Sequence, residues 1–204
     1  MYNPPKYRKN ESQFIHDFIQ EYPFATMVLQ GSQLLATHVP VLIEGPAQKF
    51  RLYAHISNNN PMWEYLRDDK EMLLIFKGPD AYISSSWYAA PDIPTWDYSA
   101  VHVNARIRLQ SQGELQRSLE KLIAHFEKEQ ENPLDIDKIP QDVWTENFKE
   151  ITGFWLEPTE MVGIAKLHQG FPKSDILNIT EQLNKHPSCP MNEIGALIKK
   201  QYGV

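Results

Sequence analysis

The chain has 204 residues, of which 42% are apolar and 23% charged, and these values are typical of one globular domain with a sizeable core. The net charge of −6 argues against a DNA-binding surface, because duplex DNA is usually bound by a basic stripe. The single cysteine, Cys189, excludes an internal disulfide and a cysteine-based metal cluster. No apolar run approaches 18 residues and the first residues contain no apolar h-region, so we expect a cytoplasmic protein without a signal peptide or a membrane span.

The first half of the chain predicts one helix followed by a strand-rich block. The helix is expected over 10–20, with Asn10 as its N-cap and Gln13 three residues later. Pro61 opens a short helix, 61–66, and Gly78-Pro79 predicts a turn. Strands are expected over 24–30, 34–44, 50–56, 71–77 and 81–88.

The second half mixes strands and helices. One long alternating strand, 98–110, is followed by an amphipathic helix over 113–129. The remaining expected elements are a helix over 140–150, strands over 153–156 and 161–167, and tail helices over 174–185 and 192–201. Together these elements predict a mixed β and α fold, built on an antiparallel barrel with peripheral helices.

Two neighbouring segments combine serines, aromatic side chains and a histidine. They are 81–88, with the sequence AYISSSWY, and 94–103, with the sequence PTWDYSAVHV. Planar aromatic ligands need apolar faces for stacking and a few hydrogen-bonding groups, and these segments supply both. The alternative is an aromatic core with solvated hydroxyl groups.

Two further polar clusters lie earlier in the chain, at 36–40 (ATHVP) and 55–63 (HISNNNPMW). In the second cluster a strand leads into the helix opened by Pro61. Ser and Asn side chains before a helix N-terminus could hold a phosphate. The alternative is that Asn60 only caps that helix.

Other common sites are not indicated. The seven histidines form no H-x-x-x-H or H-E-x-x-H pair. His38, His55 and His102 could meet in space, but hydrogen-bonded core histidines are the simpler interpretation, and we expect no metal site. The chain lacks G-x-S-x-G, G-x-G-x-x-G and P-loop motifs, which argues against a triad hydrolase, a Rossmann dinucleotide-binding protein and a P-loop NTPase.

The order and spacing of many short motifs resemble the PaiB-type FMN-binding negative transcriptional regulators over about residues 1 to 170. The motifs that carry the resemblance are MYNP at 1–4, PFAT at 23–26, ATHVP at 36–40, YAH at 53–55, NPMW at 60–63, FKGP at 76–79, AYIS at 81–84, SWY at 86–88, PTW at 94–96, AVHV at 100–103, GF at 153–154 and KL at 166–167.

The resemblance implies the split barrel shared with pyridoxamine 5′-phosphate oxidases, in which two subunits pair and FMN lies at the dimer interface. It implies a split-barrel domain over 1–170 and a helical extension over 171–204 that packs on it. The residues expected to bind FMN are Thr37, His38, His55, Ser57, Asn60, Ser84, Ser86, Trp87, Trp96 and His102.

The chain departs from the family pattern at several positions. Asn58 stands where an arginine is usual, two residues before the Asn-Pro pair, and an amide carries no charge for a phosphate. We therefore expect weaker FMN binding, with FMN lost during purification, and tighter FMN binding in an Asn58→Arg variant. The other departures are Asp80, Ser85, His168 and Gly170.

Three functions compete at this point. The first is an FMN-binding regulator without turnover of its own, and the second is an FMN-dependent oxidoreductase of the split-barrel class. The third is DNA recognition by the two tail helices, which their long connector and the late position of Lys199 and Lys200 argue against. The simpler interpretation is that the apolar residues of these helices pack on the barrel.

Overall fold

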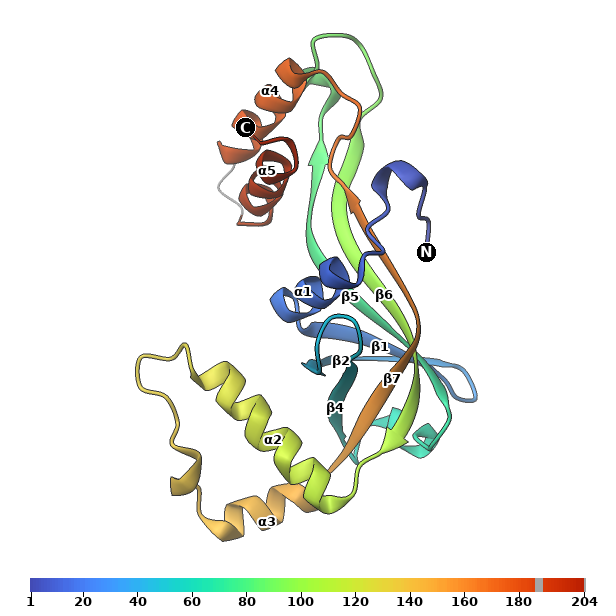
Figure 1. The fold of residues 1–204 in the computed structure, drawn as a ribbon, viewed down its shortest axis with the longest axis vertical. Helices are drawn as coiled ribbons and strands as arrows, with labels where there is room; N and C mark the ends of the chain where they lie inside the picture. Colours follow the sequence, from blue (N-terminus) through green and yellow to red (C-terminus); the bar gives the residue numbers. More distant parts are fainter. Residues whose placement is uncertain (186–188, 204) are drawn as a thin grey trace.

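The computed structural model describes residues 1–185 and 189–203. Within this part of the chain, seven strands form one sheet in the order β2-β1-β5-β6-β7-β4-β3, with every neighbouring pair antiparallel. Figure 1 shows the sheet curled into a half-barrel, from which β5, β6 and β7 extend toward the top. The strands are β1 (Phe24–Gln30), β2 (Leu34–Pro40), β3 (Leu42–Glu44), β4 (Arg51–Ser57), β5 (Glu71–Ile83), β6 (Thr95–Leu109) and β7 (Ile151–Lys166).

The helices gather at three places around the sheet (Figure 1). α1 lies beside its middle, α2 and α3 project at the lower end, and α4 and α5 cover the upper end. Their bounds are α1 (Ser12–Glu21), α2 (Gln112–Glu127), α3 (Gln141–Lys149), α4 (Lys173–Asn184) and α5 (Cys189–Tyr202). Short 3-10 helices span Pro5–Tyr7, Pro61–Tyr65, Ser85–Trp87 and Ile136–Lys138. No helix among the described residues is long and apolar enough to span a membrane.

The two largest apolar clusters among the described residues form the cores of the fold. The larger core lies between α1 and the concave face of the sheet, where alternate strand residues such as Met27, Leu74 and Val103 are fully buried. The second core joins the tail helices to the upper ends of β5 and β7. Its buried members are Ala81, Ile83, Ala165, Leu167, Ile176, Ile179, Leu183, Ile194 and Ile198.

The prediction of separate strands around Gly78-Pro79 was wrong. β5 runs from Glu71 to Ile83, with a register shift against β6 between Lys77 and Asp80. Pro79 has no N–H to donate, and a β-bulge is the place where a long strand accommodates it. The strand also ends earlier than predicted, because residues 85–87 form a 3-10 helix.

A single strand also replaces the two that were predicted near Pro158. β7 continues from Ile151 to Lys166, and its pairing with β6 is irregular beside Asn104 and Ala105. Pro158 lies at that irregularity and is therefore accommodated without ending the strand. By contrast, the strand predicted over 34–44 is interrupted at Val41, so that β2 and β3 are separate elements.

The first and the last predicted helices begin at other residues than predicted. α1 begins at Ser12, with Glu11 as N-cap and without a side-chain cap. Asn10 Oδ1 instead accepts a hydrogen bond from Gly163 N at 3.0 Å and ties the N-terminal segment to β7. α5 begins at Cys189, three residues earlier than predicted, and the connector residues 186–188 lie outside the described part of the chain.

Candidate functional site

One row of residues crosses the convex face of the sheet. His38, Thr26, Ile75 and His102 lie directly opposite one another on β2, β1, β5 and β6. Directly paired residues point to the same face, and three strand spacings separate His38 from His102 by about 14 Å. The structure therefore places these two predicted residues on one face, away from the core.

A cavity of about 390 Å³ lies beside His102 on this face. Asn3 and Arg8 of the N-terminal segment line it together with Asn104 of β6. The Oδ1 atom of Asn3 is buried without a hydrogen-bond partner among the described residues. Burial, and secondarily the N-terminal ammonium group, lower the pKa of His102, so its imidazole is neutral at pH 7. This is a polar cavity of the size that small ligands occupy.

Thr37 and Asn60 meet at the edge of the barrel. Asn60 Nδ2 donates to Thr37 Oγ1 at 3.1 Å, while Asn60 Oδ1 accepts from Met62 N at 2.9 Å. Asn60 therefore does cap the helix at Pro61–Tyr65, as the simpler interpretation predicted. Because that helix is a short 3-10 turn whose Met62 N–H is already occupied, the N–H groups there offer less to a phosphate than we expected.

Asn58 makes hydrogen bonds within the fold that the sequence did not indicate. Its Nδ2 donates to Lys149 O at 2.8 Å, and its Oδ1 accepts from Thr152 Oγ1 at 2.7 Å. Its backbone N–H donates to Glu150 O at 2.8 Å. The amide thus fastens the end of β4 to the α3–β7 junction, and Ser57 beside it accepts from Asn59 N at 3.2 Å.

Four of the predicted site residues lie at the upper end: Ser84, Ser86, Trp87 and Trp96. Ser84 caps the 3-10 helix at Ser85–Trp87, and its Oγ lies 2.8 Å from Ser86 Oγ. Trp96 is 55% exposed and packs edge-to-face on Tyr82, with ring centroids 6.0 Å apart. Trp96 faces the same way as His102, six residues along β6, which is about 20 Å at ~3.4 Å per residue.

Residues of the tail hold this upper segment in place, and sequence reasoning missed them. Trp87 O accepts from Asn178 Nδ2 at 2.7 Å, and Ala89 N donates to Asp175 Oδ1 at 3.1 Å. Both partners lie on α4. The tail helices therefore shape the segment that carries Ser84, Ser86 and Trp87.

A buried histidine completes this anchoring. His168 Nδ1 lies 2.6 Å from Asp97 Oδ2, and Nε2 lies 2.8 Å from the Tyr88 hydroxyl. The Tyr202 hydroxyl donates to His168 O at 2.6 Å. Asp97 is fully buried and His168 is 3% exposed. The only sequence signal was the departure from the family pattern at His168.

His55 lies on β4, two residues before Ser57 and far from His102. It pairs with Gly153 of β7, whereas His102 pairs with Val162. The nine residues from 153 to 162 correspond to about 30 Å along the strand. Burial lowers the pKa of His55. The structure does not bring His55 and His102 of one chain together.

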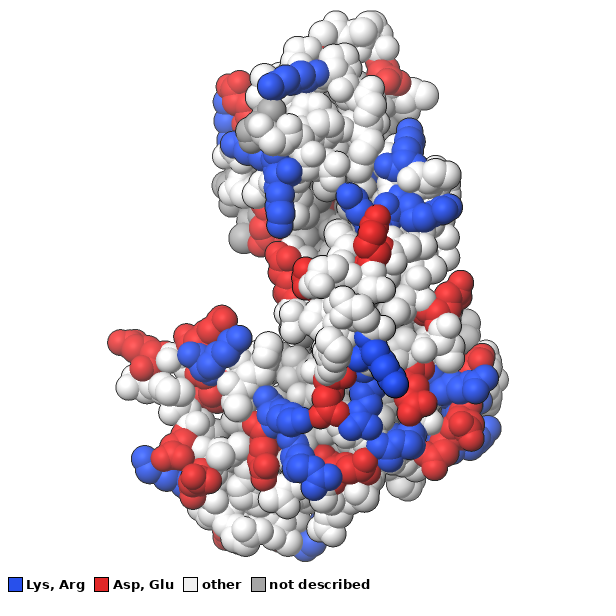
Figure 2. Space-filling view, in the orientation of Figure 1, with Lys and Arg blue, Asp and Glu red and all other residues white. Residues whose placement is uncertain are grey.

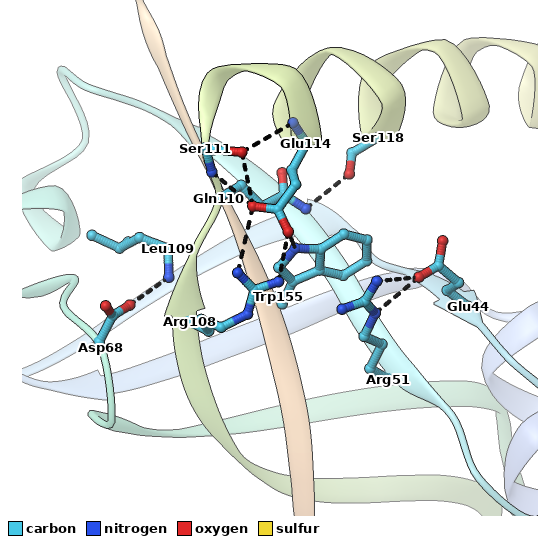
Figure 3. Close-up of polar contacts among 10 residues, drawn as sticks. All are labelled: Glu44, Arg51, Asp68, Arg108, Leu109, Gln110, Ser111, Glu114, Ser118 and Trp155. Atoms are coloured by element: carbon cyan, nitrogen blue, oxygen red, sulfur yellow. Dashed lines mark hydrogen bonds and ion pairs between the residues drawn. The ribbon is translucent and has the colours of Figure 1, made fainter.

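The lower end near α2 is fixed by a polar network that was also missed (Figure 3). Glu114, in a capping box with Ser111, accepts from Arg108 Nη2 at 2.7 Å and from Trp155 Nε1 at 3.0 Å. These bonds hold the pKa of the Glu114 carboxyl well below its usual range, and the bond from Arg108 has the largest effect. The Arg51 guanidinium lies over the Trp155 ring, 3.5 Å from its centroid. This network fixes the start of α2 against β4, β6 and β7.

The comparisons with known proteins agree with this architecture. The family model described as "Putative FMN-binding domain" matches residues 1–160. The chain is 30% identical over 200 residues to "Protease synthase and sporulation protein PAI 2" of Bacillus subtilis, covering 98% of this chain and 97% of that protein.

Two solved flavoprotein structures share the fold at low sequence identity. The FAD- and heme-binding protein of Mycobacterium smegmatis has a TM-score of 0.61 and 13% identity, covering 83% of this chain and 78% of that one. The flavocytochrome Anf3 of Azotobacter vinelandii has a TM-score of 0.58 and 12% identity, covering 89% and 76%. The family match, the relative and the curled antiparallel sheet lead to one conclusion: the chain belongs to the PaiB-type family of split-barrel proteins with an FMN-binding domain.

Proposed function

We propose that the chain binds FMN, its family's cofactor, on the convex face of the sheet, with the flavin ring beside His102. The observation that carries this proposal is the polar cavity of about 390 Å³ beside His102, at the β6 end of the row that also contains His38. The cavity offers Arg8 as a cation and the unpartnered Asn3 Oδ1 as an acceptor. A neutral imidazole at His102 can donate or accept one hydrogen bond at the polar edge of a flavin. Bound FMN would supply one- or two-electron redox chemistry.

We further propose a homodimer in which each FMN contacts both subunits. Trp96 lies about 20 Å from His102 along β6. Asn60 lies beside β2, an edge strand that is three strands away from β6. One FMN is too short to contact Trp96 and Asn60 of the same chain. A second chain packed on the convex face would bring its Trp96 to the first chain's site. Phe24 and Leu34, which are 65% and 70% exposed on this face, are apolar side chains that such packing would cover.

The regulatory role that the family name implies belongs to the proposal as well. The tail helices bury their apolar faces on the barrel, and on the face shown in Figure 2 acidic and basic residues are interspersed without a basic stripe. Regulation would therefore act through a protein partner or through small-molecule chemistry, without direct reading of DNA. In the alternative, an FMN-dependent oxidoreductase, bound flavin would be reduced by a nicotinamide cofactor and reoxidised by a substrate.

The visible spectrum of the protein, purified and then incubated with FMN, tests the cofactor directly. The absorption spectrum of FMN should shift when the protein is added at equilibrium, and Trp87→Ala and His102→Ala should each weaken FMN binding in a fluorescence titration without unfolding the protein. Unchanged titrations for both variants would place the site elsewhere. Rapid bleaching of the flavin by NADH or NADPH, followed by turnover with an acceptor, would favour the oxidoreductase.

Light scattering tests the assembly. At micromolar concentration the protein should have about twice the 23.7 kDa mass of the chain. A monomer that still binds FMN with full affinity would contradict the shared site while leaving FMN binding itself intact.

A further inference from the structure

A second cavity, of about 360 Å³, lies on the opposite side of the sheet from the His102 cavity, between α1 and α5. Figure 1 shows α1 and α5 one above the other, with β5 and β6 beside both. Phe14, Phe18 and Tyr22 of α1 and Leu197 of α5 supply its apolar lining. If a water-sized group takes about 30 Å³, the cavity has room for about a dozen non-hydrogen atoms.

The floor of this cavity carries one polar group without a partner. Ser99 on β6 is 2% exposed, and its Oγ has no hydrogen-bond partner among the described residues. The absence of a side chain at Gly78 makes room for this hydroxyl, since a Cβ there would lie 2.5 Å from Ser99 Oγ. A buried hydroxyl without a partner costs free energy, and a ligand hydroxyl reaching the floor would remove that cost.

The walls and mouth of the cavity carry charges of both signs. Asp17 and Glu21 come from α1, Lys9 from the preceding segment and Lys200 from α5. None of the four forms an ion pair with another of them in the described structure. Asp17 Oδ1 accepts from Gln13 and Glu21 Oε1 from the Tyr22 hydroxyl, whereas no hydrogen bond to either lysine ammonium occurs among the described residues.

We propose that this cavity binds a free amino acid with an aromatic side chain, best with a ring hydroxyl as in tyrosine. The ammonium group of the ligand faces Asp17 and Glu21, and its carboxylate faces Lys9 and Lys200. The ring packs among the aromatic side chains of α1, and its hydroxyl pairs with Ser99 Oγ. Phenylalanine and tyrosine have about the size that the cavity admits. Neither His102 nor the FMN site takes part in this binding.

Isothermal titration of the full-length, FMN-saturated protein tests the proposal with five compounds. L-tyrosine and L-phenylalanine should bind, with tyrosine about fivefold tighter because of one additional neutral hydrogen bond. 3-Phenylpropionate lacks the ammonium group, 2-phenylethylamine lacks the carboxylate, and glycine lacks the ring. Each of these should bind at least tenfold more weakly than phenylalanine. Equal binding of either single-charge analogue would overturn the zwitterion assignment.

Two variants locate the site. Leu197→Trp, at a half-buried position on α5, should fill the cavity and abolish binding, while FMN affinity stays unchanged. Ser99→Ala should remove the preference for tyrosine over phenylalanine and leave phenylalanine affinity within about twofold. Binding that survives Leu197→Trp, or no heat with tyrosine and phenylalanine at millimolar concentration, would overturn the proposal.

Discussion

The two ends of the sheet hold their candidate site residues by different means. At the lower end, Asn60 is fixed to Thr37 and Met62 by its own amide, within the residues 1–160 that the family model matches. At the upper end, Trp87 and Tyr88 are held by Asn178 and by His168, which lie beyond that range. The upper segment, with the three predicted residues Ser84, Ser86 and Trp87, is therefore held by residues beyond position 160, which are not themselves predicted to contact FMN.

The largest expected effect comes from breaking the buried pair at the upper end. His168→Ala leaves the Asp97 carboxylate buried without its partner, and such a loss costs about 3–5 kcal/mol. The matched variant at the lower end is Arg108→Ala, whose ion pair with Glu114 is partly exposed and should contribute about 1 kcal/mol or less. Urea unfolding measures both, and equal losses would contradict the contrast between the two ends.

The Asn58→Arg variant tests whether position 58, at the lower end, faces the FMN phosphate. The variant loses the two hydrogen bonds of the Asn58 amide, so the free energy of unfolding should fall by about 1–2 kcal/mol. An arginine near the phosphate should still improve FMN binding relative to riboflavin by about tenfold. The measurement is the ratio of the two dissociation constants. A changed stability with an unchanged ratio would show that this position does not face the phosphate.

Asn178→Ala tests whether the tail shapes the upper segment. Removing the bond from Asn178 Nδ2 to Trp87 O should cost about 1 kcal/mol and increase amide hydrogen exchange over residues 84–89. Leu177→Ala, a change at an exposed position on the same helix, is the control and should leave that exchange unaltered. Since exchange is measured without FMN, the result does not depend on the proposed cofactor site.

The smallest expected effect is on pH dependence. Burial lowers the pKa of His55 below its ordinary value of 6.5, so the unfolded chain binds this proton more readily than the folded one. Stability is therefore complete above about pH 6.5 and declines as pH falls through the unfolded-state pKa. His55→Gln should lose less stability than wild type between pH 7 and pH 5, and parallel losses would show that His55 does not contribute.

The sequence predicted most elements because their apolar periodicity is strong, as in α2 and in the alternating strand β6. It failed at Gly78-Pro79, where a turn was predicted, and between the strands predicted over 153–156 and 161–167, because β-bulges accommodate Pro79 and Pro158 without ending a strand. These bulges depend on the partner strand, which local patterns do not show.

The candidate site was predictable only in part. The family motifs indicated His38 and His102, and the structure places both on one face. The same motifs did not show that His55 and His102 pair with β7 residues that are nine positions apart, Gly153 and Val162. The pairing of His168 with Asp97 joins residues 71 positions apart, and its geometry arises only from the folded chain.

The shared FMN site is tested most directly with heterodimers of two defective chains. Trp96→Ala removes a ring at the upper end. Asn60→Asp keeps an oxygen that can cap the 3-10 helix but places a negative charge at the expected phosphate position. Neither homodimer should bind FMN tightly.

A heterodimer isolated with two different affinity tags contains one site with both defects and one site with neither. If each FMN is bound by Trp96 of one subunit and Asn60 of the other, the heterodimer should bind one FMN per dimer with wild-type affinity. If both residues served the same FMN from one chain, every site would carry a defect, and the absence of any tight site would contradict the account.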